Sequence, residues 1–270
     1  MTINKYGVIQ QTINKSATDR YIEEIYVNGY TIIEDCISHD LLKKVSDSYD
    51  KTQQEEERKA KASGSELTAD RNIIRCPLAH DEIFLEVARL QTPLSIIEKI
   101  LGKNIVLLMQ NAILNKPDQE QYQAQWHRDL NYQHFVSSKP VAMNFLVCVD
   151  DFTVENGATM ALPGTHMFES FPSDEYVEKN QVSLTAPKGS VFILNCMTYH
   201  RTGDAVKNAP RRRGINHVIG LPFLAQQIDI PRYLKSKRNA DYSDDKELFD
   251  YLGYRWNPSE SAEEWRNLRK

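Results

Sequence analysis

The sequence predicts a mainly β fold with flanking helices, and the β part has the spacing of an antiparallel sandwich or barrel. After Gly102, short runs rich in β-branched and aromatic residues recur at regular intervals: IVLLMQNAIL, VAMNFLVCV, ATMAL, VSLTA, SVFILNCM and GINHVIGLPF. Turn-forming segments separate these runs: NKPD, ENG, LPG and PKGS. This spacing favours antiparallel strands over a parallel sheet with crossover helices.

The first hundred residues show helical patterns instead. Apolar residues recur at helical spacing over 16–29 and again from Ser38, and a short strand over 31–33 separates these two helices. The second helix runs into the charged stretch QQEEERKAKASGSE, which we expect to be an exposed helix end and loop, with a mobile lid as the alternative. A third helical segment spans about 81–101, and we expect Pro93 to divide it, because proline lacks the backbone N–H of a helix interior.

One domain of 270 residues is the simplest organisation, since no repeat or low-complexity linker interrupts the chain. We expect a helical N-terminal part over about 1–102, a strand-rich core over about 103–225 and a C-terminal extension over about 226–270. The extension is rich in charge and tyrosine, and we expect it to pack irregularly around the outside.

Composition excludes several function classes. No apolar run approaches the roughly 20 residues that cross a bilayer. The net charge is −4 and basic residues are interspersed with acidic ones, so we expect no nucleic-acid partner. Four scattered cysteines argue against a disulfide framework, and the first residues lack a secretory signal. We therefore expect a cytoplasmic protein in a reducing compartment, which suits ferrous iron.

The segment QWHRDLNYQH supports two interpretations. As His-Arg-Asp it is typical of a kinase catalytic loop, but the Asn expected five residues after Asp129, the glycine-rich loop and the Asp-Phe-Gly segment are all missing. As His-x-Asp it offers two metal ligands, because residues i and i+2 of a strand share a face while Arg128 points away.

A second element strengthens the metal interpretation. His200 follows the apolar strand SVFILNCM, and antiparallel pairing can bring it beside His127 and Asp129. Two histidines and one carboxylate with open positions are typical of non-heme ferrous oxygenases, whereas zinc usually takes a closed tetrahedron or different partners. A structural trio of hydrogen-bonded side chains is the alternative.

These residues resemble the phytanoyl-CoA dioxygenase-like family of Fe(II)- and 2-oxoglutarate-dependent oxygenases. The matching segments are NGYTIIEDCISHDLLKKV, WHRD, ENGATMALPGTH with Thr165 in place of a serine, and His200 with Arg211. The resemblance implies a double-stranded β-helix, that is, a cupin-like jelly roll, with the N-terminal helices packed on one sheet. It also implies Fe(II) on the three ligands, 2-oxoglutarate and O2 as cosubstrates, and stimulation by ascorbate. The carboxylate of Asp129 argues for oxygenation, because halogenating relatives have a small residue there.

The resemblance also assigns roles around the iron. Arg211 is the expected anchor for the distal carboxylate of 2-oxoglutarate, although its neighbours Arg212 and Arg213 leave the register uncertain by one place. Thr202 is expected to share this carboxylate. Asn115 and Gln110 are expected near the other end of the cosubstrate. The remaining candidates, for lining the substrate pocket, are Asn111, Gln125 and Tyr132.

The implied function is a dioxygenase that oxidises an unactivated C–H bond and releases succinate and CO2. Hydroxylation is the usual outcome, with dealkylation, desaturation and ring formation left open. We expect a small soluble metabolite, amine-bearing or a natural-product intermediate, as substrate, and a monomer or homodimer without a membrane partner. The alternatives are a non-catalytic metal- or ligand-binding jelly-roll protein and a cupin-like metal hydrolase or isomerase.

Overall fold

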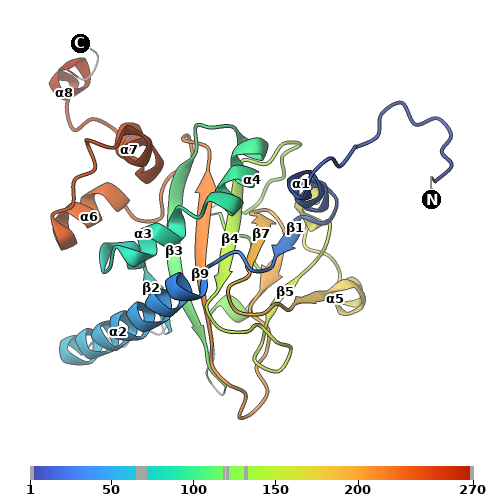
Figure 1. The fold of residues 1–270 in the computed structure, drawn as a ribbon, viewed down its shortest axis with the longest axis horizontal. Helices are drawn as coiled ribbons and strands as arrows, with labels where there is room; N and C mark the ends of the chain where they lie inside the picture. The colour runs from blue at the N-terminus through green and yellow to red at the C-terminus, as the bar shows by residue number, and fades with distance from the viewer. Residues whose placement is uncertain (1–2, 65–71, 118, 120–121, 131–132, 268–270) are drawn as a thin grey trace.

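A computed structural model describes residues 3–64, 72–117, 119, 122–130 and 133–267. The expected mainly β fold with flanking helices is confirmed: within these residues the strands form two antiparallel sheets that do not close into a barrel (Figure 1). The larger sheet has the order β1(Tyr30–Ile33)-β7(Val191–Asn195)-β4(Ala142–Cys148)-β9(Arg212–Gly220)-β3(Val106–Asn115)-β2(Ile73–Arg75). The smaller sheet has the order β6(Val182–Leu184)-β5(Thr159–Ala161)-β8(His200–Arg201).

The larger sheet is buried on both faces. Along β7, Val191 and Ile193 join the main core, where helices cover the sheet, whereas Phe192 and Leu194 pack with Ala161 and other residues of the smaller sheet. This alternation makes the run 192–194 core on both sides of the sheet, and it follows from the two-residue period of a strand. The inward face of the larger sheet therefore forms one wall of the space between the sheets.

The N-terminal helices begin and end near the expected residues. The helix α1 (Ala17–Asn28) starts after Ser16, whose side chain accepts from Asp19 N, and it ends at Gly29 with φ +87°. The helix α2 (His39–Ser63) starts after Ser38, and its second half carries the exposed charged stretch. Side chains of both helices enter the main core under the larger sheet.

The third helical segment divides at a different place from the one we expected. Two helices, α3 (Ile83–Ala88) and α4 (Gln91–Leu101), meet at Arg89 and Leu90, and Pro93 lies in the first turn of α4. Backbone N–H groups in a first turn have no intrahelical acceptor, so proline costs little there and does not divide the helix.

The expectation that the C-terminal extension packs irregularly is wrong. It forms α6 (Ile230–Arg238), α7 (Lys246–Leu252) and α8 (Ala262–Asn267), and the remaining short elements of the chain are α5 (Asp174–Asn180), η1 (Pro77–Ala79), η2 (Tyr122–Ala124), η3 (Thr165–Met167) and η4 (Tyr254–Trp256). Leu234 and Leu252 are fully buried in the main core. The apolar pairs Ile230 with Leu234 and Leu248 with Leu252 have the four-residue spacing of a helix face. No helix in the described parts of the chain is long and apolar enough to cross a membrane.

Candidate metal centre

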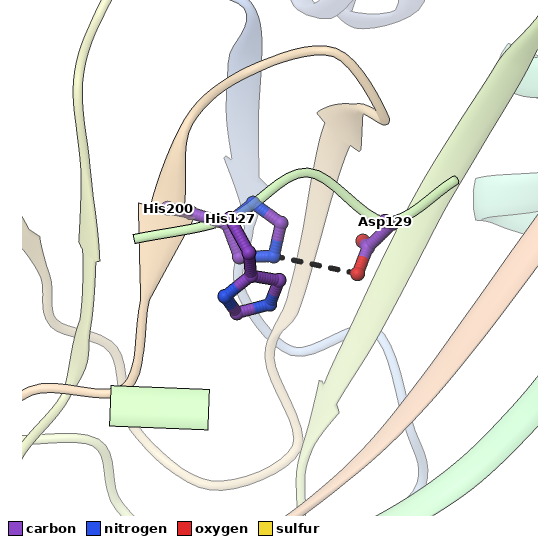
Figure 2. A group of neighbouring side chains, drawn as sticks. All are labelled: His127, Asp129 and His200. Atoms are coloured by element: carbon purple, nitrogen blue, oxygen red, sulfur yellow. Dashed lines mark ion pairs between the residues drawn. The ribbon is translucent and has the colours of Figure 1, made fainter. Parts of the chain in front are cut away.

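His127, Asp129 and His200 converge between the two sheets, and we call them the metal triad (Figure 2). An antiparallel bridge joins the two histidines: His127 N donates to His200 O at 3.0 Å, and His200 N donates to His127 O at 3.1 Å. His200 Nε2 lies 3.5 Å from Asp129 Oδ1, and one ligand atom from each residue lies within 4.8 Å of the others. A single ion placed among these atoms can reach all three.

Backbone carbonyls fix the orientation of both imidazole rings. His127 Nδ1 contacts Gln125 O at 2.7 Å, and His200 Nδ1 contacts Thr198 O at 2.9 Å. Because a carbonyl oxygen only accepts, each Nδ1 carries the proton and each Nε2 keeps its lone pair. This is the tautomer that a metal-binding histidine needs, and a partner on the second ring nitrogen is the usual support for it.

For Asp129 and His200, charge interactions within the triad oppose the effect of burial on the pKa. Burial alone would raise the pKa of Asp129, but the contacts with His200, His127 and Asn144 together outweigh burial and hold that pKa at about 2. Burial likewise disfavours protonated His200, but the Asp129 carboxylate and the Thr198 carbonyl together outweigh burial and raise the pKa of His200. Burial, and then His200, lower the pKa of His127 to about 4. Near neutral pH the site thus presents a carboxylate and at least one neutral imidazole.

A pocket opens beside the triad, and the buried cation in its wall is Arg212. The lining residues are Ile113, Gln123, His127, Asn144, Leu146, Thr159, Leu194, His200, Arg201, Thr202, Arg212 and Asn216. Arg212 is 2% exposed, its guanidinium carbon lies 4.3 Å from the ring centre of Phe152, and its Nε and Nη2 have no hydrogen-bond partner. Burial lowers its pKa to about 10, so it remains a cation at neutral pH with two donors free for an anion.

The structure does not bring Arg211 to this pocket. The Arg211 side chain is 46% exposed, and its Nη2 lies 2.7 Å from Asp50 Oδ2 at the surface. Arg213 lies on the opposite face of β9 from Arg212 and pairs with Asp150 at 2.7 Å. Because side chains alternate along a strand, only Arg212 of the three points between the sheets. The expected arginine is therefore displaced by one residue.

Thr202 lies in the pocket as expected, but Asn115 and Gln110 do not. The side chain of Asn115 donates to Asn156 O at 3.1 Å and to Gly203 O at 3.3 Å, and so ties β3 to two loops. Gln110 faces the helices on the other side of the sheet, where its Nε2 donates to Phe84 O at 2.7 Å. Both amides are committed to backbone carbonyls, so neither is placed to contact a ligand in the pocket.

Neither of the two substrate-pocket candidates that the structure describes, Asn111 and Gln125, lines the pocket. Asn111 is buried, and its Nδ2 lies 3.3 Å from Gln227 Oε1. Gln125 is exposed and contributes only its carbonyl, which orients His127. Tyr132 lies outside the described residues. Sequence reasoning instead missed Asn144 and Asn216, which line the pocket with buried Oδ1 atoms that have no hydrogen-bond partner.

Arg128 points away from the triad, as the strand alternation predicts, and it supports the site from behind. It is 1% exposed and donates to the carbonyls of Met197 (2.8 Å), Gln133 (3.0 Å), Thr165 (3.1 Å), Glu169 (3.2 Å) and Phe168. A guanidinium offers five N–H donors, so one side chain ties the segment of His127 and Asp129 to the loop after β5 and to the residue before Thr198.

Two residues of the matching segment ENGATMALPGTH, Gly157 and Thr165, support the strand β8 that carries His200. Gly157 has φ +74°, and a Cβ there would lie 2.3 Å from Gly203 O, so only glycine allows the two loops to approach this closely. The hydroxyl of Thr165 accepts from Tyr199 N at 3.1 Å and donates to Leu162 O at 2.7 Å. Threonine therefore supplies, beside His200, the hydroxyl that serine would supply.

Known proteins resemble this chain in sequence and in fold. The uncharacterized proteins Rv1501 of Mycobacterium tuberculosis and Mb1539 of Mycobacterium bovis are each 26% identical over 231 residues, which is 82% of this chain and 82% of each relative. Among solved structures, the nickel complex of the non-heme monooxygenase ThoJ superposes with a TM-score of 0.59 at 15% identity, covering 77% of this chain and 80% of ThoJ.

Two further structures share the fold. The non-heme alpha-ketoglutarate-dependent epimerase SnoN from nogalamycin biosynthesis has a TM-score of 0.58 at 14% identity, covering 84% of this chain and 90% of SnoN. HygX from Streptomyces hygroscopicus, with nickel and 2-oxoglutarate bound, has a TM-score of 0.57 at 15% identity, covering 77% and 88%. These likenesses establish the cupin-like, jelly-roll type of fold.

The model of the phytanoyl-CoA dioxygenase (PhyH) family matches residues 25–213, a span that includes the whole metal triad. The chain therefore belongs to the phytanoyl-CoA dioxygenase (PhyH) family.

Proposed function

We propose that the protein is a non-heme Fe(II)- and 2-oxoglutarate-dependent dioxygenase. One observation carries the proposal: the two histidines of the metal triad line the same pocket as a buried arginine with two free donors. The donor set of two imidazoles and one carboxylate is the one that ferrous oxygenases use, and it leaves positions open on one side of the ion. An unpaired buried guanidinium is costly unless an anion completes it, so its place in the pocket fits a dicarboxylate cosubstrate.

The residues of the pocket divide the work. The Nε2 atoms of His127 and His200 and the carboxylate of Asp129 would hold the iron, which when bound would supply dioxygen activation coupled to decarboxylation of 2-oxoglutarate to succinate and CO2. Arg212, rather than Arg211, would bind the distal carboxylate of 2-oxoglutarate through Nε and Nη2, and Thr202, which also lines the pocket, would share it. Apolar side chains in the lining exclude water from the reacting groups.

For the primary substrate we propose a small molecule that carries an O–H or N–H group, such as an amine-bearing metabolite or a natural-product intermediate. The two unpaired oxygens, Asn144 Oδ1 and Asn216 Oδ1, are acceptors, and 2-oxoglutarate as a dianion offers them no donor. The neighbour SnoN acts in nogalamycin biosynthesis, which makes natural-product intermediates sensible first compounds to test. Hydroxylation is the proposed outcome, with dealkylation or desaturation as products that the same assay detects.

The test is succinate formation by the purified protein with Fe(II), ascorbate, 2-oxoglutarate and a metabolite extract, with untargeted detection of compounds whose mass changes. We expect succinate only when all components are present, and none with Asp129→Ala. Metal binding without any 2-oxoglutarate turnover would favour a non-catalytic binding protein. Chemistry that continues without 2-oxoglutarate and survives Arg212→Leu would favour a cupin-like hydrolase or isomerase.

A further inference from the structure

We propose that Asn144 is a positioning residue that restricts Asp129 to one metal-binding oxygen. The inference rests on the proposed function, because it concerns how the metal triad leaves room for 2-oxoglutarate and dioxygen. Asn144 is a residue of β4, and it contacts the triad only through the carboxylate of Asp129.

The two oxygens of Asp129 have different partners. Oδ2 accepts a hydrogen bond from Asn144 Nδ2, whereas Oδ1 faces His200 Nε2 at 3.5 Å, on the side where the ligand atoms of the triad converge (Figure 2). The Asp129 side chain is only 6% exposed, so water has little access to Oδ2. Asn144 is therefore the group that distinguishes the two oxygens, and Oδ1 is the one left for the ion.

The orientation of the Asn144 amide is fixed by the same contact. An ionised carboxylate only accepts hydrogen bonds, so the NH2 group must face Asp129, and a rotated amide would place two acceptors against each other. In this orientation Asn144 Oδ1 has no hydrogen-bond partner, and the residue is only 3% exposed. A buried acceptor left unpaired destabilises the fold. The rest of the β4 run Ala142–Cys148 is apolar, so an apolar side chain at position 144 would avoid this cost. An asparagine retained only for packing would not carry this cost.

The hydrogen bond has a consequence for coordination. A carboxylate with both oxygens free can bind one ion through either or both of them, and the second oxygen takes an additional position on the metal. The proposed reaction needs three open positions, two for the keto acid and one for dioxygen. By holding Oδ2 away from the ion, Asn144 keeps Asp129 to a single bond and leaves those positions free. Partners of ligating side chains tune a metal site in this way.

The experiment uses Co(II) as a spectroscopic probe, because its visible absorption reports the coordination number without turnover. Asn144→Leu removes the donor at similar volume, and Asn144→Ala removes it without adding bulk. Asn216→Leu is the matched control, since Asn216 is an equally buried pocket asparagine on the adjacent strand with no hydrogen bond to the triad. Thermal melting without metal checks that each variant is folded.

We expect both Asn144 variants to bind Co(II) with an affinity within roughly 10- to 100-fold of wild type. Their Co(II) spectra should change, and 2-oxoglutarate titrated into the Co(II) protein should bind at least about tenfold more weakly, while Asn216→Leu keeps the wild-type spectrum. Spectra of both Asn144 variants identical to wild type would overturn the inference. The spectra need no 2-oxoglutarate, so they decide it even if wild type binds none, which would instead overturn the proposed function.

Discussion

Replacing Arg212 by leucine should have different effects on two quantities: the stability of the protein without ligand and its affinity for 2-oxoglutarate. Without a ligand, the Arg212 guanidinium is 2% exposed and its Nε and Nη2 have no partner, so a leucine of similar bulk should leave stability unchanged or raise it. Replacing buried ionic groups by apolar ones is often neutral or stabilising by about 1–4 kcal/mol. With 2-oxoglutarate bound, the same change removes a buried charge pair, which typically costs about 2–5 kcal/mol. Binding should therefore weaken roughly 30-fold to several thousand-fold.

Two measurements test this pair of effects: thermal melting without ligand, and anaerobic titration of 2-oxoglutarate into the metal-loaded protein. Arg211→Leu is the control, because the exposed pair of Arg211 with Asp50 is worth at most about 1 kcal/mol and lies away from the pocket. Arg212→Lys should fall between, since lysine keeps the charge but cannot make two parallel bonds. The reasoning is refuted if Arg211→Leu abolishes 2-oxoglutarate binding while Arg212→Leu retains it.

Three further results are expected. Asp129→Ala should abolish the rise in melting temperature that Fe(II) or Co(II) gives the wild type, while a surface change such as Asp204→Ala leaves it intact; an undiminished rise would mean that the ion binds elsewhere. Metal affinity should be full above the raised pKa of His200 and fall as the pH drops through it, because the proton and the ion compete for Nε2. Calorimetry at several pH values measures this affinity, and an affinity that does not change with pH would contradict the prediction. Arg128→Met should lower the free energy of unfolding by about 3 kcal/mol or more, because it leaves buried carbonyls without donors. Urea denaturation measures this loss. A loss no larger than that of Arg211→Leu would contradict the role of Arg128 in holding the loop after β5.

Strong local patterns made much of the fold predictable. Ser16 and Ser38 begin the first two helices and Gly29 ends the first, because capping groups act within one turn. The alternation of Phe192, Ile193 and Leu194 indicated a strand buried on both faces. The C-terminal helices were missed because they are short and lie in a stretch rich in charge and tyrosine. Short helices of this kind gain their stability from the main core, not from a strong local pattern.

The convergence of His127, Asp129 and His200 was predictable because a metal site would need particular residue types at a particular spacing. The strand period places His127 and Asp129 on one side and Arg128 on the other, and the structure agrees. Of the three arginines that stand in a row, the family resemblance pointed to Arg211, whereas the structure places Arg212 in the pocket. The pattern of β9 does choose: Arg213, Ile215 and Ile219 share the helix-covered face, so Arg212 and Asn216 face the pocket.

The residues that sequence reasoning missed share a physical property. Arg128 and Asn144 hold backbone carbonyls and the Asp129 carboxylate through hydrogen bonds, and Gly157 allows two loops to approach closely. Nothing in their own chemistry distinguishes them from ordinary polar or turn residues. Their position in the sequence is what distinguishes them. Asn144 is a polar residue in the otherwise apolar, buried run Ala142–Cys148 of β4, and the buried Arg128 stands in sequence between His127 and Asp129. A buried polar group needs a partner, so such positions indicate a contact before the structure shows which one it is. The same argument makes Asn216, whose Oδ1 still lacks a partner, the pocket residue where a substrate donor should be sought next.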